Sequence, residues 1–149
     1  MKIYLAKPIS GYSYDEIVNY YINTRDFLIS KGWEVLFPMI SKEYLRNETK
    51  FKAEGYGNPC STNHAITERD RWMVQTADVV YVDLCGSKFA SIGCISELAW
   101  AHDRGKHTIV AMESNNVHRH AFVLEMADII FERHVDAIEY LEKLIGGHV

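Results

Sequence analysis

Cysteine is scarce in this chain of 149 residues, which contains only Cys60, Cys85 and Cys94. An odd number of cysteines without a C-x-x-C pair or a companion histidine spacing indicates neither a disulfide framework nor a zinc site. We therefore expect a protein of the reducing cytoplasm that binds no metal.

Long apolar runs are also absent. The opening MKIYLAKPIS holds four apolar residues in a row before Lys7 and Pro8, too few for a signal peptide, and no stretch approaches the length of a membrane span. We expect a soluble, intracellular protein that does not contact a membrane.

Positive charge is not concentrated anywhere. The 16 lysines and arginines are outnumbered by 20 acidic residues, the formal net charge is −4, and no Lys/Arg cluster occurs. A protein that grips a nucleic-acid backbone needs such a cluster, because the phosphates dominate its affinity. We expect no nucleic-acid polymer as a partner, and any related ligand should be a small molecule.

The composition that is present, 48% hydrophobic and 24% charged, suits one globular domain over residues 1–149. Strand-like and helix-like segments alternate along the chain. The expected strands are residues 2–6, 33–38, 78–84, 107–112 and 128–131, and the expected helices are residues 15–32, 64–77, 91–105, 121–127 (a short turn or helix) and 135–147. This alternation predicts an α/β fold, an open parallel sheet of about five strands in a Rossmann-like or flavodoxin-like three-layer arrangement.

Residues 41–63 break the alternation. They lose all periodicity and collect Gly, Pro and Asn, which predicts a long loop or a broken helix. Long loops in compact domains are more often functional lids than spacers, and a disordered surface excursion is the alternative.

Ligands of such sheets bind at the carboxyl ends of the strands. The segments KPISGY, CGSKFASIG and ESNNVHRH each follow a predicted strand and should converge there. In the second, Ser91 and Gly93 stand where a helix begins, so free N–H groups and the helix dipole would attract an anion. The structural alternative is that Ser91 only caps the helix while Gly93 allows close packing.

Glu97 and Asp70 are the candidate reacting groups. Glu97 has small or apolar neighbours and no cationic partner one turn away, and its place near a helix N-terminus favours the ionised form of a nucleophile. A solvent-facing glutamate is the alternative.

Asp70 falls on the apolar stripe of its helix, where burial would raise its pKa and make it a proton donor near neutral pH. An ion pair with Arg69, Arg71 or an arginine elsewhere is the alternative. A charged and a protonated carboxyl group are the usual pair for breaking a glycosidic bond.

The blocks KIYLAKPISG, ERDRWMVQTADVVYVDL and SIGCISELAWAHDRGK resemble the nucleoside 2-deoxyribosyltransferase superfamily, which includes the deoxynucleoside 5′-monophosphate N-glycosidases. They cover most of the chain outside residues 41–63 and the C-terminal helix. The resemblance implies an enzyme that cleaves the N-glycosidic bond of (2′-deoxy)nucleoside 5′-monophosphates through a covalent glycosyl-glutamate intermediate, releasing free base and sugar phosphate without a cofactor.

Carried over by position, the resemblance makes Glu97 the nucleophile, Asp70 the acid that acts on the leaving base, and Tyr4 the residue that orients the nucleophile. Ser91 stands where the monophosphate branch has a phosphate-binding serine and where nucleoside transferases tend to have an aspartate that binds the sugar hydroxyl. An aspartate would repel a phosphate dianion, so Ser91 favours monophosphates. The other expected substrate-binding residues are Lys7, Ile9, Ser10, Gly11, Gly93 and His120.

Lys7 replaces the small residue usual in the LAGPISG form, and it either reaches a phosphate or points to solvent. His118, Arg119 and His120 lie in the loop where family members place residues that complete a neighbouring subunit's site, which implies a homodimer or a higher homo-oligomer. A solvated polar loop is the alternative for these three residues.

Two rival functions remain open. A deoxyribosyltransferase would pass the sugar to another base through the same intermediate, whereas a non-catalytic nucleotide sensor would keep Glu97 only to bind a ribose. Tyr12, Tyr14, Trp72 and Trp100 could stack on a base, and for the two tryptophans we favour packing in the core.

Overall fold

The computed structural model describes residues 1–47 and 56–147, and its strands form one parallel sheet. The strands are β1 (Lys2–Ala6), β2 (Glu34–Leu36), β3 (Val79–Asp83), β4 (His107–Ala111) and β5 (Ile129–Phe131), in the order β2-β1-β3-β4-β5. The predicted α/β class is confirmed, and the order is that of the flavodoxin-like doubly wound folds.

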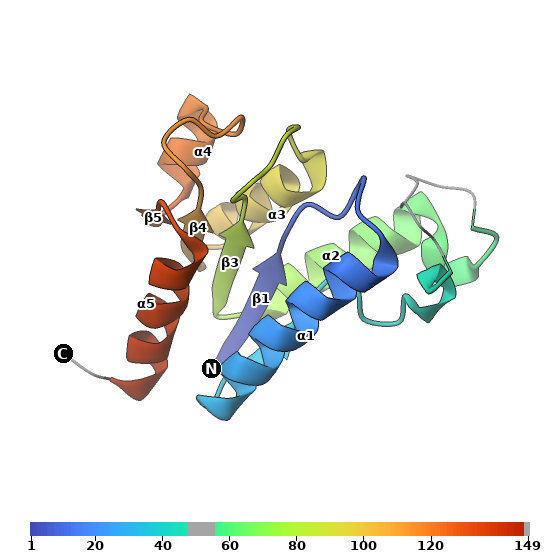
Figure 1. Ribbon diagram of the computed structural model, residues 1–149, viewed down its shortest axis with the longest axis horizontal. Coiled ribbons are helices and arrows are strands. Elements are labelled where there is room, and N and C mark those ends of the chain that lie inside the picture. The colour runs from blue at the N-terminus through green and yellow to red at the C-terminus, as the bar shows by residue number, and fades with distance from the viewer. Residues whose placement is uncertain (48–55, 148–149) are drawn as a thin grey trace.

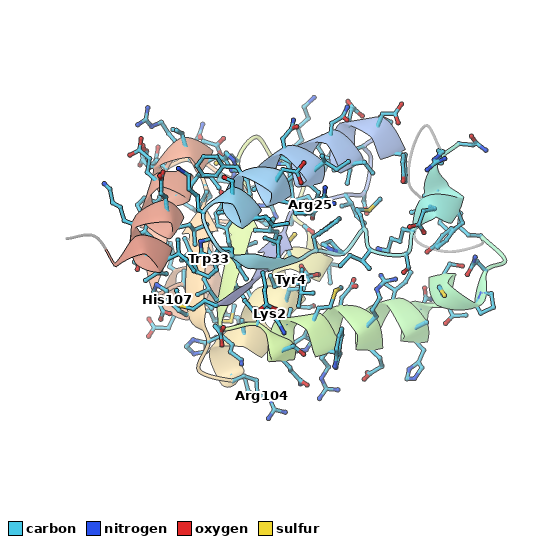
Figure 2. The ribbon with its side chains drawn as sticks, turned by 90° about the horizontal axis from the view of Figure 1, so that it is seen from below. Lys2, Tyr4, Arg25, Trp33, Arg104 and His107 are labelled. Carbon is cyan, nitrogen blue, oxygen red and sulfur yellow. The ribbon has the colours of Figure 1, made fainter. Side chains whose placement is uncertain are left out.

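Helices cover both faces of the sheet. They are α1 (Tyr14–Ser30), α2 (Asn63–Thr76), α3 (Ile92–Asp103), α4 (Ala121–Met126) and α5 (His134–Gly146). Figure 2 shows α1 in blue and α5 in red above the sheet and α2 in green below it, and two separate apolar cores fill the spaces between the layers. No helix within the described ranges is long and apolar enough to pass through a membrane.

The alternation of side chains along β1 decides which core each residue enters. Ile3 and Leu5 pack toward α1 and α5, whereas Tyr4 and Ala6 pack toward α2 and α3. Successive residues of a strand point to opposite faces, so this division follows from the period of two. Tyr4 is thereby placed on the same side as the helices that carry the candidate acids.

Strand β2 is shorter than the predicted residues 33–38. It lies at the edge of the sheet and pairs only with β1, through Glu34, Val35 and Leu36. The chain then turns away at Phe37, so the last residues of the predicted strand form no ladder.

The predicted loop of residues 41–63 contains two short 3₁₀ helices, η1 (Glu43–Leu45) and η2 (Pro59–Ser61), and residues 48–55 lie outside the described residues. Thr62 caps α2 at the end of this segment, because its side chain accepts a hydrogen bond from the N–H of Ala65.

Strand order reverses between β1 and β3, and this switch point is where open α/β sheets bind ligands. In Figure 1 the arrows of β1 and β3 point to the upper edge of the sheet, where the loops after both strands lie and α3 begins. The candidate residues of the sequence should therefore meet at this edge.

Candidate active site

A cavity of about 620 Å³ opens at this edge. Its walls are the loop after β1, the segment after β2, helix α2, and the loop that leads into α3. Eight of the ten predicted site residues line it: Lys7, Ile9, Ser10, Gly11, Asp70, Ser91, Gly93 and Glu97. The two candidate acids, which are 27 positions apart in the sequence, thus share one cavity.

A hydrogen bond from Tyr4 orients the side chain of Glu97. The Tyr4 hydroxyl donates a hydrogen bond of 2.7 Å to Oε1 of Glu97, and Tyr4 points from β1 toward the layer that contains α2 (Figure 2). Only 7% of Glu97 is exposed, so the alternative of a solvent-facing glutamate is wrong. Tyr4 fixes the orientation of one carboxyl oxygen and leaves the other without a hydrogen bond from the described residues.

Burial raises the pKa of Glu97 to about 8, against the Tyr4 hydrogen bond, which lowers it. Asp70 raises this pKa further, and Lys42 lowers it. We expected the helix N-terminus to keep Glu97 ionised, whereas burial favours the protonated form and is the largest cause of the pKa shift. At neutral pH the protonated form of Glu97 is therefore favoured in this structure, contrary to the prediction from sequence.

Asp70 is buried on the core side of α2, as predicted, and it also forms the ion pair that was the alternative. Nε and Nη2 of Arg69 lie 3.1 and 3.0 Å from Oδ1 of Asp70, and Nη2 also donates to the carbonyl oxygen of Pro38 at 3.4 Å. Burial still raises the pKa of Asp70, while Lys42 and Arg69 act in the opposite direction. No hydrogen bond from the described residues reaches Oδ2.

The two carboxyl groups interact, because Asp70 contributes to the raised pKa of Glu97. Such a pair loses its protons in steps that belong to the pair and not to one residue. With a single proton between them, the arrangement with the charge on Glu97 and the proton on Asp70 can be populated. That arrangement supplies both a nucleophile and an acid.

Tyr4→Phe should move the alkaline limb of the kcat/KM profile, where the carboxyl pair loses its last proton, to higher pH. The lost hydrogen bond lowers the pKa of Glu97 in the unaltered protein, so its removal raises that pKa above about 8. The arrangement with the proton on Asp70 then forms a smaller share of the singly protonated pair, so maximal activity should fall as well. Rates across neutral and alkaline pH measure the shift, with Tyr140→Phe, whose hydroxyl bonds His107 at 2.9 Å, as control. An unmoved limb would show that Tyr4 does not govern the ionisation of Glu97.

Ser91 caps α3, since its Oγ accepts a hydrogen bond of 3.3 Å from the N–H of Cys94. Its own N–H donates to Nε2 of His118 at 2.8 Å and is not free for a ligand. The N–H groups of Ile92 and Gly93 meet no acceptor among the described residues. These two amides are the donors that an anion at the helix N-terminus would meet.

Gly93 is not needed for close packing, because a Cβ atom at this position would meet nothing within 4 Å. The packing alternative is therefore wrong. The open space above Gly93 leaves the first amides of α3 accessible from the cavity.

His118 anchors the loop before α3, a role that the sequence did not reveal. Because Nε2 accepts from Ser91, the ring proton resides on Nδ1 and is donated to Oδ1 of Asn116 at 2.8 Å. Asn116 in turn donates to the carbonyl oxygen of Leu84 and to Glu113. His118 is 3% exposed, so the expectation that it serves a neighbouring subunit is wrong.

His120 does not line the cavity of its own chain. It is exposed and caps α4, accepting a hydrogen bond from the N–H of Phe122 at its Nδ1. Its predicted contact with a substrate in a second copy stays a prediction.

Lys7 lines the cavity, but its ammonium lies 3.2 Å from Oδ2 of Asp83, at the end of β3. The alternative that Lys7 points to solvent is wrong. Although burial opposes ionisation, a hydrogen bond from His134 and the charge of Lys7 lower the pKa of Asp83. Lys7 and Asp83 thus join the carboxyl ends of the two strands that flank the switch point.

The aromatic lining differs from the prediction. Tyr44, Tyr56 and Phe89 line the cavity, whereas the four aromatic residues singled out in the sequence do not. Trp72 is 59% exposed, so its predicted place in the core is wrong. The aperiodic sequence around Tyr44 and Tyr56 marked a loop but gave no sign of which side chains turn inward.

Metal ligation has no support in the described ranges, where no cluster of three or more His, Cys, Asp or Glu side chains could hold an ion. Cys60, Cys85 and Cys94 are free thiols. The candidate chemistry rests on the carboxyl pair.

Comparison with known proteins identifies the family of the chain. The sequence model of the family described as nucleoside 2-deoxyribosyltransferase matches residues 3–140. No curated protein shows significant sequence similarity to the chain.

The solved structures that share the fold include three enzymes. The CMP N-glycosidase BcmB of Clostridium botulinum is 20% identical, with a TM-score of 0.57 and 97% of each chain covered. The 2-deoxyribosyltransferase of Bacillus psychrosaccharolyticus is 18% identical, with a TM-score of 0.65 over 94% of this chain and 92% of that one. The 2-deoxyribosyltransferase of Leishmania mexicana is 19% identical, with a TM-score of 0.66 over 99% of both chains. The chain belongs to the nucleoside 2-deoxyribosyltransferase family and is an enzyme of nucleoside glycosyl transfer or cleavage.

Proposed function

We propose that the protein hydrolyses the N-glycosidic bond of (2′-deoxy)nucleoside 5′-monophosphates. The observation that supports this substrate class is an anion seat in the same cavity as the carboxyl pair. The amides of Ile92 and Gly93, which meet no acceptor among residues 1–47 and 56–147, begin the helix that also carries Glu97. A phosphate bound there would hold the attached sugar over the carboxyl group about one turn farther along α3.

The substrate would span the cavity in one direction. With the phosphate at the start of α3, the anomeric carbon lies at Glu97 and the base extends toward Asp70. Tyr44 and Tyr56 also line the cavity, and their rings, with centroids 5.9 Å apart, offer apolar surface to a base.

The reaction would proceed in two displacements. The carboxylate of Glu97 attacks C1′, the C1′–N bond breaks, and Asp70 gives its proton to the departing base. Asp70 then accepts a proton from water as the water oxygen attacks C1′, which frees the sugar 5-phosphate and restores Glu97. Tyr4 keeps the attacking carboxyl group oriented through its 2.7 Å hydrogen bond.

Transfer to a second base would use the same covalent intermediate, and the family is named for this reaction. It is the second candidate function. Membership in an enzyme family removes the support for a non-catalytic sensor.

Incubating the protein with a panel of nucleosides and monophosphates, with and without an added free base, tests the proposal. We expect free base and sugar phosphate to form from monophosphates without an acceptor. Product that appears only when a second base is added would establish transfer, and preference for nucleosides would refute the phosphate seat.

Ser91→Asp should reverse the preference for a phosphate. Aspartate is as good a helix cap as serine, so α3 should form normally, but its charge would oppose a phosphate dianion at the adjacent amides. We expect kcat/KM for monophosphates to fall roughly 100-fold while that for nucleosides is retained or increased. Ser91→Thr keeps a neutral cap and is the matched control. An equal loss for both substrate classes would contradict a phosphate at this position.

The expected homodimer also stays a prediction. Its support is the exposure of three large apolar side chains, Phe89, Ile92 and Phe122, at 83%, 84% and 72%, of which Phe89 and Ile92 line the cavity. Sedimentation velocity distinguishes a dimer from a monomer. A protein that is purely monomeric at assay concentration would contradict the predicted homodimer.

A further inference from the structure

Lys42 is a buried cation to which the proposed reaction gives no role. Only 3% of the residue is exposed, and it lines the cavity that contains Asp70 and Glu97. Lysine is almost never buried to this degree unless a partner compensates its charge. Its position in the cavity wall therefore needs an explanation.

Pairing within the protein does not provide one. No hydrogen bond or ion pair joins the Lys42 ammonium to any residue in the described ranges. Burial lowers the pKa of Lys42, and Asp70 and Glu97 act in the opposite direction. Asp70 already has Arg69 as its bonded cation, so a second one is not needed to compensate its charge.

Lys42 belongs to the part of the cavity that faces the base. It precedes η1, the element that brings Tyr44 into the wall, and lies outside the loop and helix that form the anion seat. Asp70 and Glu97 both favour the charged form of Lys42, and the effect of Asp70 on its pKa is the larger. A phosphate at the start of α3 would leave Lys42 at the opposite end of the substrate.

We propose that Lys42 binds the leaving base and stabilises the negative charge that moves onto it. The inference rests on the function proposed above. As the C1′–N bond breaks, its electron pair passes to the ring nitrogen of the base, and Asp70 supplies the proton that neutralises it. The ammonium keeps its own protons and donates a hydrogen bond to a carbonyl oxygen or ring nitrogen of the base, where the charge is delocalised. Bases that present such an acceptor on this edge are the expected substrates.

Lys42→Met tests this role, because methionine fills similar space without charge or donor. The assay uses two pairs of 2′-deoxynucleoside 5′-monophosphates: guanine with 7-methylguanine, and uracil with 5-nitrouracil. In each pair the second base departs with less need for charge stabilisation, since 7-methylguanine leaves as a neutral molecule and the nitro group delocalises the anion.

We expect Lys42→Met to lower kcat roughly 100-fold for whichever ordinary bases the unaltered protein accepts, and far less for their activated counterparts. Rates for the 7-methylguanine nucleotide are corrected for its spontaneous hydrolysis. Lys143→Met, at an exposed position near the end of α5, is the matched control and should match the unaltered protein. Lys42→Gln, which keeps a donor without the charge, should give an intermediate rate.

Equal losses for both members of a pair would overturn the proposal, because Lys42 would then act on folding or on the acids and not on the departing base. Turnover of an activated substrate by Lys42→Met shows that the site is folded. If the unaltered protein releases no base from any monophosphate of the wider panel, the proposed function itself fails, and the role of Lys42 fails with it.

Discussion

Glu97→Gln should lower kcat roughly 10⁴-fold while substrate binding persists. Glutamine has the shape of glutamate and can still meet the Tyr4 hydroxyl, which lies 2.7 Å from Oε1, but an amide cannot attack C1′. The amides of Ile92 and Gly93 remain to hold a phosphate, so affinity measured by calorimetry should change little. Rapid acid quenching of the unaltered protein, followed by peptide mass spectrometry, should find a sugar phosphate attached to the peptide that contains Glu97.

Measurements of the melting temperature show whether the Glu97→Gln variant is folded. The pKa of Glu97 also predicts how this temperature should depend on pH. Burial raises the pKa of Glu97 from its usual range to about 8, so the folded state holds this proton more tightly than the unfolded state. Stability is therefore lost progressively as pH rises from the ordinary glutamate pKa of 4.5 to about 8, and no further loss from this group follows above that pH. Glu97→Gln should melt like the unaltered protein in acid and at a higher temperature in alkali.

Glu139→Gln, on an exposed part of α5, is the control for both experiments. Retained turnover in Glu97→Gln would remove Glu97 as the nucleophile. A sugar adduct on another residue would assign that role elsewhere.

Asp70→Asn should lower kcat by roughly 10²- to 10³-fold for bases that need a proton to depart. The amide cannot supply this proton, whereas Arg69, which bonds Oδ1 in the unaltered protein, loses its carboxylate partner. The loss should be small for 7-methylguanine, which leaves without protonation. The alkaline limb of the kcat/KM profile, where the acid loses its proton, should disappear in this variant and persist in Lys42→Met.

Asp103→Asn, at the exposed end of α3, is the matched control for charge and size. A melting curve measures how much stability is lost when Arg69 loses its carboxylate partner, separately from the loss of turnover. An Asp70→Asn variant that loses the same factor with every leaving base would act through structure, and Asp70 would not be the acid.

The sheet and the meeting of the two acids could be predicted because both depend on periodicity. The apolar run of β3 and the amphipathic helices predicted the α/β class. The position of Asp70 on the apolar stripe of α2 predicted that this residue is buried. The role expected of Tyr4 came from resemblance alone. The structure adds that the period of two in β1 turns this hydroxyl toward α3.

Depth of burial and contacts between distant loops could not be predicted. The protonated state of Glu97 depends on how completely the surrounding layers exclude water, which no local pattern reveals. Lys42 and Tyr44 lie in a segment without periodicity, so no rule indicated their direction. His118 reaches Ser91 across 27 positions, and the sequence contains no signal for that hydrogen bond.

Helix packing, and not loop conformation, sets the spacing between the reacting groups. Glu97 and Asp70 stand on α3 and α2, which pack against each other on one face of the sheet, and Tyr4 stands on a central strand. Lys42 and Tyr44 come instead from the irregular segment after β2. Changes in this segment can therefore alter the wall of the cavity without moving Glu97, Asp70 or Tyr4 relative to one another.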